Sequence, residues 1–155
     1  MTKPRVGFLG VGWIGRHRME AMLATGAVEA AAIADTSPEM VSEAARLAPG
    51  AKVVDGLDAM LALGLDGVVI ATPSALHADQ SIRALEAGAA VFCQKPLGRD
   101  AAEAARVVEA ARTADRLLSV DFSYRFTAGM TAIKPLIEAG AVSYTHLTLP
   151  TILRV

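Results

Sequence analysis

Short, nearly continuous apolar runs alternate along this chain with longer stretches in which apolar residues recur at helical spacing. The apolar runs cover residues 6–9, 28–34, 52–54, 67–71, 90–93 and 117–122. Runs of this length are typical of parallel strands buried on both faces, and the stretches between them have the period of crossover helices. The pattern therefore predicts an α/β fold, a doubly wound parallel sheet of six strands.

Two helices are also marked by individual residues. Ser37 followed by Pro38 predicts a helix start, because a serine hydroxyl accepts a bond from a free N–H group and proline suits the first helical position. Small apolar residues recur at helical spacing over residues 100–112, and we expect that face to be buried against the sheet. The residues of this face are Ala101, Ala104, Ala105, Val108 and Ala111.

The first apolar run leads into Gly10, Gly12 and Gly15, which have the spacing G-x-G-x-x-G. In a dinucleotide-binding loop the first glycine permits a tight turn, the second admits the pyrophosphate, and the third lets the helix pack closely on the sheet. The helix N-terminus then faces the anion with unpaired N–H groups. The motif alone fits an ordinary turn equally well in a chain with 13 glycines. Its place between a strand and a helix favours the dinucleotide loop, and we include Trp13 and Ile14 in this site.

Asp35 ends the second apolar run, twenty residues after Gly15, where such a domain is expected to carry a ribose-binding carboxylate. This carboxylate would accept hydrogen bonds from the ribose hydroxyls and repel a 2′-phosphate, and residues 36–38 contain no Arg or Lys to bind that phosphate. The arrangement favours NAD over NADP as the cofactor. The alternative is a turn residue at a strand end, where aspartate is common.

Composition limits the possible partners. The 155 residues are 53% hydrophobic and 20% charged, as in a soluble globular protein, and the formal net charge is −1. Without a run of basic residues, neither nucleic acid nor an anionic membrane is an expected partner. The single Cys93 excludes an internal disulfide and a cysteine-rich zinc site, and we predict no metal site. Residues 1–5 leave no room for a signal peptide, and no charge-free stretch before residue 139 approaches the ~18 residues of a membrane span, so we expect a cytoplasmic protein.

Three further segments, together with the glycine loop, give the chain a specific resemblance. They are residues 71–77 (Ala-Thr-Pro-Ser-Ala-Leu-His), 88–97 (Gly-Ala-Ala-Val-Phe-Cys-Gln-Lys-Pro-Leu) and 122–126 (Phe-Ser-Tyr-Arg-Phe). In this order, over about residues 4–141, the chain resembles the glucose-fructose oxidoreductase and inositol dehydrogenase family. The resemblance implies an N-terminal Rossmann domain followed by a second α/β domain that lines the substrate site and commonly mediates homo-oligomers. It also implies hydride transfer between a nicotinamide cofactor and a hydroxyl-bearing carbon of a polyol, sugar or cyclitol.

Lys95 matches the lysine of the family's Glu-Lys-Pro motif, which implies a catalytic place beside the nicotinamide and the reacting hydroxyl. An ammonium there would stabilise the negative charge that develops on the substrate oxygen. The alternative is an ordinary exposed lysine at a strand end. Gln94 departs from the family, in which glutamate is more frequent, and so removes a carboxylate next to Lys95. Pro96 matches a proline that often follows a cis peptide bond.

For several other residues the alternatives stay open. His77 lies beside the cofactor by resemblance, and a structural role is equally compatible with the sequence. Arg125 either reaches the cleft or is solvated, Trp13 either shields the cofactor loop or packs between domains, and His17 is expected to pack or cap. The predicted cofactor-binding residues are Gly10, Gly12, Trp13, Ile14, Gly15, Asp35, Thr72, Pro73, Ser74, His77, Gln94, Lys95 and Arg125.

We expect a dinucleotide-binding domain in residues 1–122 and the start of a connection to a missing second domain in residues 123–141. Residues 142–151, Val-Ser-Tyr-Thr-His-Leu-Thr-Leu-Pro-Thr, resemble a translated sequencing adaptor, so we expect residues 142–155 to be a non-native tail. The alternative is an edge strand rich in Thr and Tyr. The family's acid/base aspartate and histidine lie in its second domain, which implies that the chain as given binds cofactor without turnover. A nucleotide-binding module or regulatory NAD sensor is therefore the second class of function, whereas the complete glycine motif disfavours a Rossmann-like methyltransferase.

Overall fold

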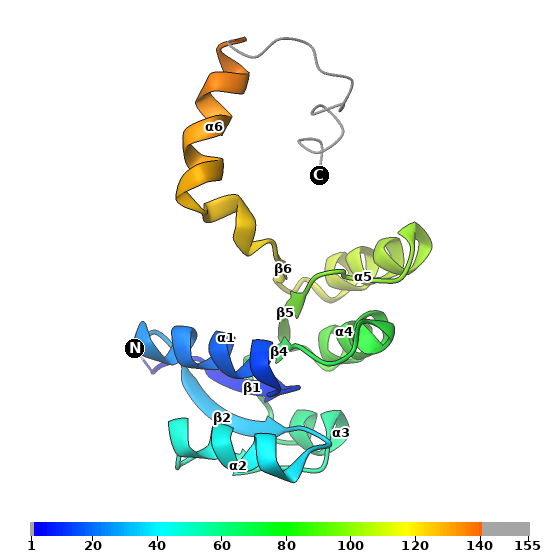
Figure 1. The fold of residues 1–155 in the computed structure, drawn as a ribbon. Coiled ribbons are helices and arrows are strands. Elements are labelled where there is room, and N and C mark those ends of the chain that lie inside the picture. The colour runs from blue at the N-terminus through cyan, green and yellow to red at the C-terminus, as the bar shows by residue number, and fades with distance from the viewer. Residues whose placement is uncertain (1, 141–155) are drawn as a thin grey trace. The chain divides into compact units, whose positions relative to one another are not determined.

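A computed structural model describes residues 2–140, and its contacts divide the chain into two compact units that meet between Asp121 and Phe122 (Figure 1). Six strands and five α-helices of the first unit follow one another in the predicted alternation. Its elements are β1 (Arg5–Leu9), α1 (Trp13–Ala24), β2 (Glu29–Ala34), α2 (Pro38–Leu47), β3 (Lys52–Val53), α3 (Leu57–Leu61), β4 (Gly67–Ile70), a 3₁₀ turn (Ser74–Leu76), α4 (His77–Glu86), β5 (Ala90–Gln94), α5 (Ala101–Ala114) and β6 (Leu118–Asp121).

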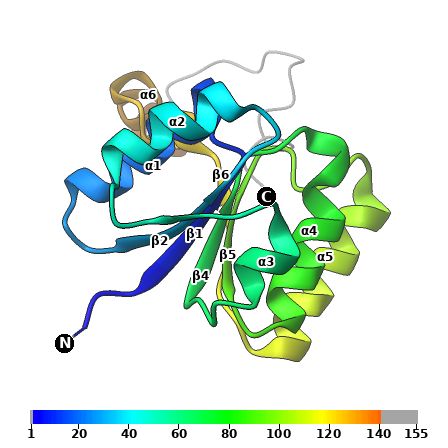
Figure 2. The ribbon, with the colours of Figure 1, turned by 90° about the horizontal axis from the view of Figure 1, so that it is seen from below.

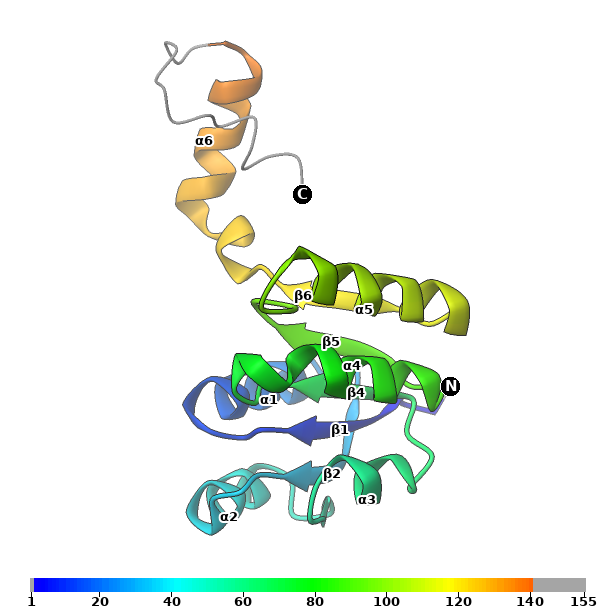
Figure 3. The same cartoon turned by 90° about the vertical axis from the view of Figure 1, so that its right-hand side faces the viewer.

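The six strands form one sheet in the order β3-β2-β1-β4-β5-β6, and every neighbouring pair is parallel (Figure 3). Each strand coincides with a predicted apolar run to within one or two residues, the usual uncertainty of element ends. The doubly wound α/β prediction is confirmed. The order reverses direction between β1 and β4, and the first connections from these two strands leave towards opposite faces of the sheet.

Helices cover both faces of the sheet, and its central strands β1, β2 and β4 are buried on both faces apart from the first residues of β1 and β2. Figure 2 shows α1 and α2 on one face and α3, α4 and α5 on the other. Successive residues of a strand point to opposite faces, so in β1 Phe8 belongs to the core beneath α1 and α2 while Leu9 belongs to the core beneath the other three helices. This double burial explains why the strands read as continuous apolar runs and not as an alternating pattern.

The helix starts follow their local chemistry. Ser37 caps α2, its hydroxyl accepting a bond from the Met40 N–H at 3.4 Å with Pro38 in the first helical position, as predicted. The Asp100 carboxylate caps α5 by accepting a bond from the Glu103 N–H at 2.8 Å.

The buried face predicted for α5 is right at Ala111, half-buried at Ala104 and wrong at the other three positions. Ala101, Ala105 and Val108 are exposed, and the buried residues of the helix are Glu103, Val107 and Ala111. Alanines occupy so many positions of this helix that several faces have a similar apolar content, and only the packing of Val107 and Ala111 against the core selects one of them.

The second unit begins with a 3₁₀ turn (Ser123–Phe126) and continues as α6 (Ala128–Glu138). The Thr127 hydroxyl caps α6 by accepting a bond from the Met130 N–H at 3.5 Å. The predicted role of residues 123–141 as a connection stays a prediction, and the proposed tail, residues 142–155, lies outside the described residues. Among residues 2–140, no helix combines the length and the apolar character needed to cross a membrane.

Candidate functional site

A crevice of about 510 Å³ opens beyond the carboxyl ends of the strands, where the strand order reverses. Loops that follow β1, β2, β3 and β4 line it together. Of the predicted site residues, the crevice lining includes Gly10, Gly12, Asp35, Thr72 and Pro73. This is the position at which open α/β sheets bind their ligands.

The lining also contains residues that sequence analysis missed, among them Asp55, Gly56, Leu76 and Gln80. Asp55 and Gly56 come directly after the third apolar run, so the rule that ligands bind at the carboxyl edge could have included them. Gln80 lies on α4 and carried no such signal.

The structure requires glycine at two of the three loop positions, for different reasons, and leaves the third position open. Gly10 has a φ of 82°, and a Cβ there would lie 2.6 Å from the backbone of Ala71 and Thr72. A Cβ at Gly15 would lie 1.9 Å from the Gly10 carbonyl oxygen, so α1 can approach the strand only because this residue is glycine. Around Gly12, in contrast, no atom lies within 4 Å of the Cβ position. Packing therefore does not require glycine at position 12, which borders the crevice.

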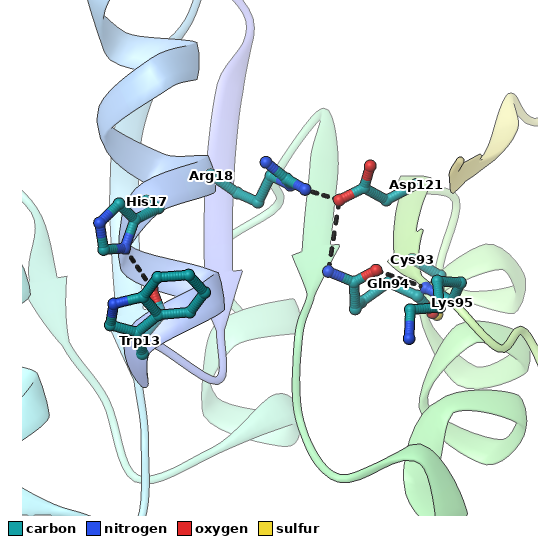
Figure 4. A network of polar contacts seen from close by, with 7 residues as sticks. All are labelled: Trp13, His17, Arg18, Cys93, Gln94, Lys95 and Asp121. Atoms are coloured by element: carbon teal, nitrogen blue, oxygen red, sulfur yellow. Dashed lines mark hydrogen bonds and ion pairs between the residues drawn. The ribbon is translucent and has the colours of Figure 1, made fainter. Parts of the chain in front are cut away.

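The N-terminus of α1 is suited to an anion. Gly12 is the N-cap residue, no side chain caps the helix, and its first turn carries no acidic residue. Its first N–H groups and positive dipole end are therefore available to a phosphate. Trp13 and Ile14 follow at the start of the helix, and both are exposed. The Trp13 ring packs against the ring of His17, 4.6 Å between centroids, and the Trp13 carbonyl lies 2.6 Å from His17 Nδ1, which is the local packing role expected of His17 (Figure 4).

Backbone N–H groups fix the Asp35 carboxylate at the crevice. Val11 N–H donates to Oδ2 at 2.7 Å, and Ser37 N–H donates to Oδ1 at 2.9 Å. The bond from Val11 ties the end of β2 to the glycine loop. Because a carboxylate offers about four lone-pair sites, both oxygens keep capacity to accept bonds from a diol.

His77 is almost fully buried, with 1% of its surface exposed. Its Nδ1 lies 2.7 Å from the Pro96 carbonyl oxygen and its Nε2 lies 2.8 Å from the Thr72 carbonyl oxygen. A carbonyl oxygen thus lies within hydrogen-bond distance of each ring nitrogen, so His77 bridges the loop after β4 and the loop after β5, and its part in cofactor binding stays a prediction. Ser74 lies in the short 3₁₀ turn just before α4 and is not part of the crevice lining.

Lys95 follows the last residue of β5 and is exposed, and the Lys95–Pro96 peptide bond is cis. Its backbone N–H donates to Gln94 Oε1 at 2.8 Å, while Gln94 Nε2 donates to Asp121 Oδ2 at 3.3 Å (Figure 4). Arg18 of α1 forms an ion pair with the same Asp121 oxygen. Neither Asp121 nor Arg18 was among the predicted site residues, although Asp121 lies next to the end of the predicted strand 117–122, at the edge where the site was expected.

Cys93 is fully buried beneath this loop, and burial raises the pKa of its thiol to about 11. A thiol that stays protonated is a poor nucleophile, so Cys93 acts here as a small buried hydrophobic side chain. Arg125 belongs to the second unit, where its guanidinium lies 5.4 Å from the centre of the Phe122 ring. Its role as a cofactor ligand stays a prediction.

The strand order, the glycine loop before α1 and the carboxylate at the end of β2 together define a dinucleotide-binding domain of the Rossmann class. Comparison with known proteins identifies the family. The sequence model described as "Oxidoreductase family, NAD-binding Rossmann fold", that of the glucose-fructose oxidoreductase and inositol dehydrogenase family, matches residues 4–122. The chain belongs to this family, and residues 4–122 are an NAD-binding domain.

Individual relatives are similar over most of this chain. Inositol 2-dehydrogenase of Rhodococcus erythropolis is 37% identical over 139 residues, which are 88% of this chain and 40% of the relative. The corresponding enzyme of Acidiphilium cryptum is 38% identical over 138 residues, 86% of this chain and 41% of the relative. Among solved structures, the WlbA dehydrogenase from Bordetella pertussis in complex with NADH and UDP-GlcNAcA has a TM-score of 0.79 and 34% identity, covering 89% of this chain and 40% of that one. The chain thus spans about 40% of the length of the curated relatives it matches.

Proposed function

We propose that this protein takes part in NAD-dependent hydride transfer to or from a hydroxyl-bearing carbon of a polyol, sugar or cyclitol, with the crevice holding NAD and Lys95 contacting the substrate oxygen. The observation that carries the proposal is the open space at Gly12, where the protein leaves the N-terminus of α1 free at the crevice. Lys95 stands at the same carboxyl edge of the sheet, directly after β5.

Gly12, Asp35 and Lys95 each have a defined part in this proposal. The N–H groups at the start of α1 bind the pyrophosphate, and Gly12 leaves room for it. Asp35 accepts bonds from the adenosine ribose hydroxyls in the orientation that Val11 and Ser37 fix. Bound NAD supplies the nicotinamide that exchanges the hydride. Lys95 donates a hydrogen bond to the substrate oxygen and so stabilises the negative charge that develops there.

The substrate class rests on the relatives. Curated relatives of this chain are inositol 2-dehydrogenases, and a similar solved structure contains a nucleotide-sugar acid. We infer a cyclitol or sugar hydroxyl as the reacting group. As in the family, an aspartate and a histidine of a second domain would complete the acid/base set, and that domain would also mediate homo-oligomers. A cytoplasmic location accords with this chemistry.

A second candidate is a nucleotide-binding module without turnover. The observation that favours it is the coverage of about 40% of the relatives, because the substrate-lining domain of the family has no counterpart among residues 2–140. For the 155-residue chain by itself we therefore propose NAD binding without oxidation of polyols.

The cofactor part of the proposal is tested by calorimetric titration of the 155-residue chain with NAD and NADH. We expect saturable binding that Lys95→Ala weakens only slightly, because the ammonium acts mainly on the substrate oxygen and not on the dinucleotide. Absence of binding by a folded chain would contradict the proposal.

The part of Lys95 in hydride transfer is tested in a protein that carries this domain together with a second domain of the relatives' length. Lys95→Ala is expected to lower kcat by about 10²-fold or more, which is far more than it weakens the binding of NAD. Lys52→Ala, which removes an exposed lysine from β3, is the matched control and should turn over normally. Normal turnover by Lys95→Ala would make Lys95 a plain surface residue.

A further inference from the structure

Asp121 is a buried carboxylate at the carboxyl end of β6, with only 6% of its surface exposed. It is the register partner of Gln94, the last residue of β5, so the two residues lie side by side in the sheet. Arg18 reaches Asp121 from α1 across 103 residues of sequence. One carboxylate oxygen, Oδ2, receives bonds from both Arg18 Nε and Gln94 Nε2. A buried charge of this kind is stable only while such partners remain in place.

Gln94 connects this carboxylate to the backbone of Lys95. Its amide nitrogen donates to Asp121 at 3.3 Å, and its amide oxygen accepts from the Lys95 N–H at 2.8 Å (Figure 4). A neutral amide can make both contacts at any pH, since one end donates and the other accepts, whereas a glutamate could do so only in its protonated form. The result is a continuous chain of hydrogen bonds from Arg18 through Asp121 and Gln94 to Lys95.

An ionised glutamate at position 94 would lose one of these two contacts. Its carboxylate could still accept the bond from Lys95 N–H, but its second oxygen would face Asp121 Oδ2, where Gln94 now places an NH₂ group. Two carboxylates in such proximity cannot both ionise without a large electrostatic cost, so one of them would hold a proton. Arg18 would be the cation facing the pair from α1, with Lys95 following on the loop.

We propose that Gln94 and Asp121 are a coupled pair of positioning residues, in which the amide at 94 is matched to the carboxylate at 121 and the pair fixes the backbone from which Lys95 extends. The consequence for Lys95 rests on the proposed function, whereas the coupling itself does not. The departure of Gln94 from the glutamate that the resemblance implies is then matched by Asp121 on the neighbouring strand.

The test uses three variants of the 155-residue chain: Gln94→Glu, Asp121→Asn and the two combined. Thermal unfolding is measured from pH 4 to pH 8. Gln94→Glu should lose stability at pH 8 and regain it towards pH 4, because the paired carboxyls have a raised pKa in the folded state and their stability is present below that pKa and lost above it. A shift of about one pKa unit corresponds to a roughly tenfold larger unfolding constant at pH 8 than at pH 4, relative to the parent chain.

The double variant should remove this pH dependence, since the carboxylate introduced at position 94 would then face a neutral amide at position 121. Asp58→Asn is the control for loss of an Asp–Arg pair, because Asp58 pairs with Arg83 on the exposed surface. When Asp58→Asn is combined with Gln94→Glu, the stability of the combined variant should depend on pH as that of Gln94→Glu alone does. The coupling would be overturned if Gln94→Glu were destabilised equally at every pH. It would also be overturned if the double variant were no more stable at pH 8 than Gln94→Glu.

Amide hydrogen exchange at Lys95 reports the positioning directly. We expect exchange at least about tenfold faster in Asp121→Asn and in Gln94→Glu at pH 7, and a return towards the parent rate in the double variant. Unchanged exchange in both single variants would show that the pair does not hold Lys95. None of these measurements involves cofactor or substrate, so failure of the proposed hydride transfer would leave their outcome untouched.

Discussion

Gly12 and Gly15 provide the sharpest separation of cofactor binding from folding in this protein. At Gly12 a Cβ would meet no atom within 4 Å, and the φ of −60° suits any L-residue. Asparagine and aspartate are both favoured at an N-cap, so Gly12→Asn and Gly12→Asp should change the free energy of unfolding by no more than about 1 kcal/mol. At Gly15 the Cβ of alanine would lie 1.9 Å from a backbone oxygen.

The cost of Gly15→Ala follows from this overlap. The Gly10 carbonyl cannot move without shifting the loop or α1, and overpacking of this kind costs about 1–3 kcal/mol. For a chain of this size that corresponds to a decrease in Tm of roughly 3–12 °C. Gly15→Ala should therefore unfold at a lower temperature than either variant of Gly12.

For NAD binding, we expect the two Gly12 variants to be the more strongly affected. Gly12→Asn puts a side chain where the pyrophosphate is expected and should weaken binding at least tenfold. The aspartate of Gly12→Asp has almost the same shape as this asparagine and adds a negative charge. Two unit charges about 4 Å apart repel by about 4 kcal/mol at an effective dielectric constant of 20, and screening lowers this value. We expect Gly12→Asp to bind NAD roughly 10²-fold more weakly than Gly12→Asn.

Calorimetric titration with NAD and thermal unfolding, applied to all three variants, check both halves of the argument. Parent-like affinity in Gly12→Asp would refute the assignment of the pyrophosphate to this helix N-terminus. A decrease in Tm of Gly12→Asn as large as that of Gly15→Ala would show that position 12 is needed for packing and that the two functions are not separate.

Three other outcomes are expected. The chain should bind NAD(H) in preference to NADP(H), and Asp35→Asn should reduce that preference; equal or tighter binding of NADP(H) by the parent chain in the same titration would remove Asp35 from this role. Side-chain and backbone hydrogen bonds from Arg99 lower the pKa of Glu103 from 4.5 to about 2, so this carboxylate contributes stability above pH 4.5 that is lost as the pH falls towards 2. Glu103→Gln should remove that part of the acid dependence in urea unfolding, and an unchanged pH profile would contradict it. Trimming to residues 1–141 should change NAD affinity and Tm little, whereas a clear loss of stability, or polyol-dependent formation of NADH by the 155-residue chain, would show that residues 142–155 belong to the native protein.

The sequence by itself determined the strands, the glycine loop and the start of α2. Each of these depends on interactions within a few residues or on burial that is uniform along a segment. A strand covered on both faces needs apolar residues at every position, and Ser37 with Pro38 acts on the helix that directly follows. Such features are visible in a linear pattern because their physical causes are local.

The tertiary structure decided which residues meet at the carboxyl edge of the sheet. The order β3-β2-β1-β4-β5-β6 places Gln94 beside Asp121 and brings Arg18 to the same carboxylate, although α1 and β6 are far apart in sequence. Packing also chose the buried face of α5, where alanines left the hydrophobic pattern ambiguous. The physical reason is the same in both cases: strand pairing and core packing join segments through contacts that no single segment encodes.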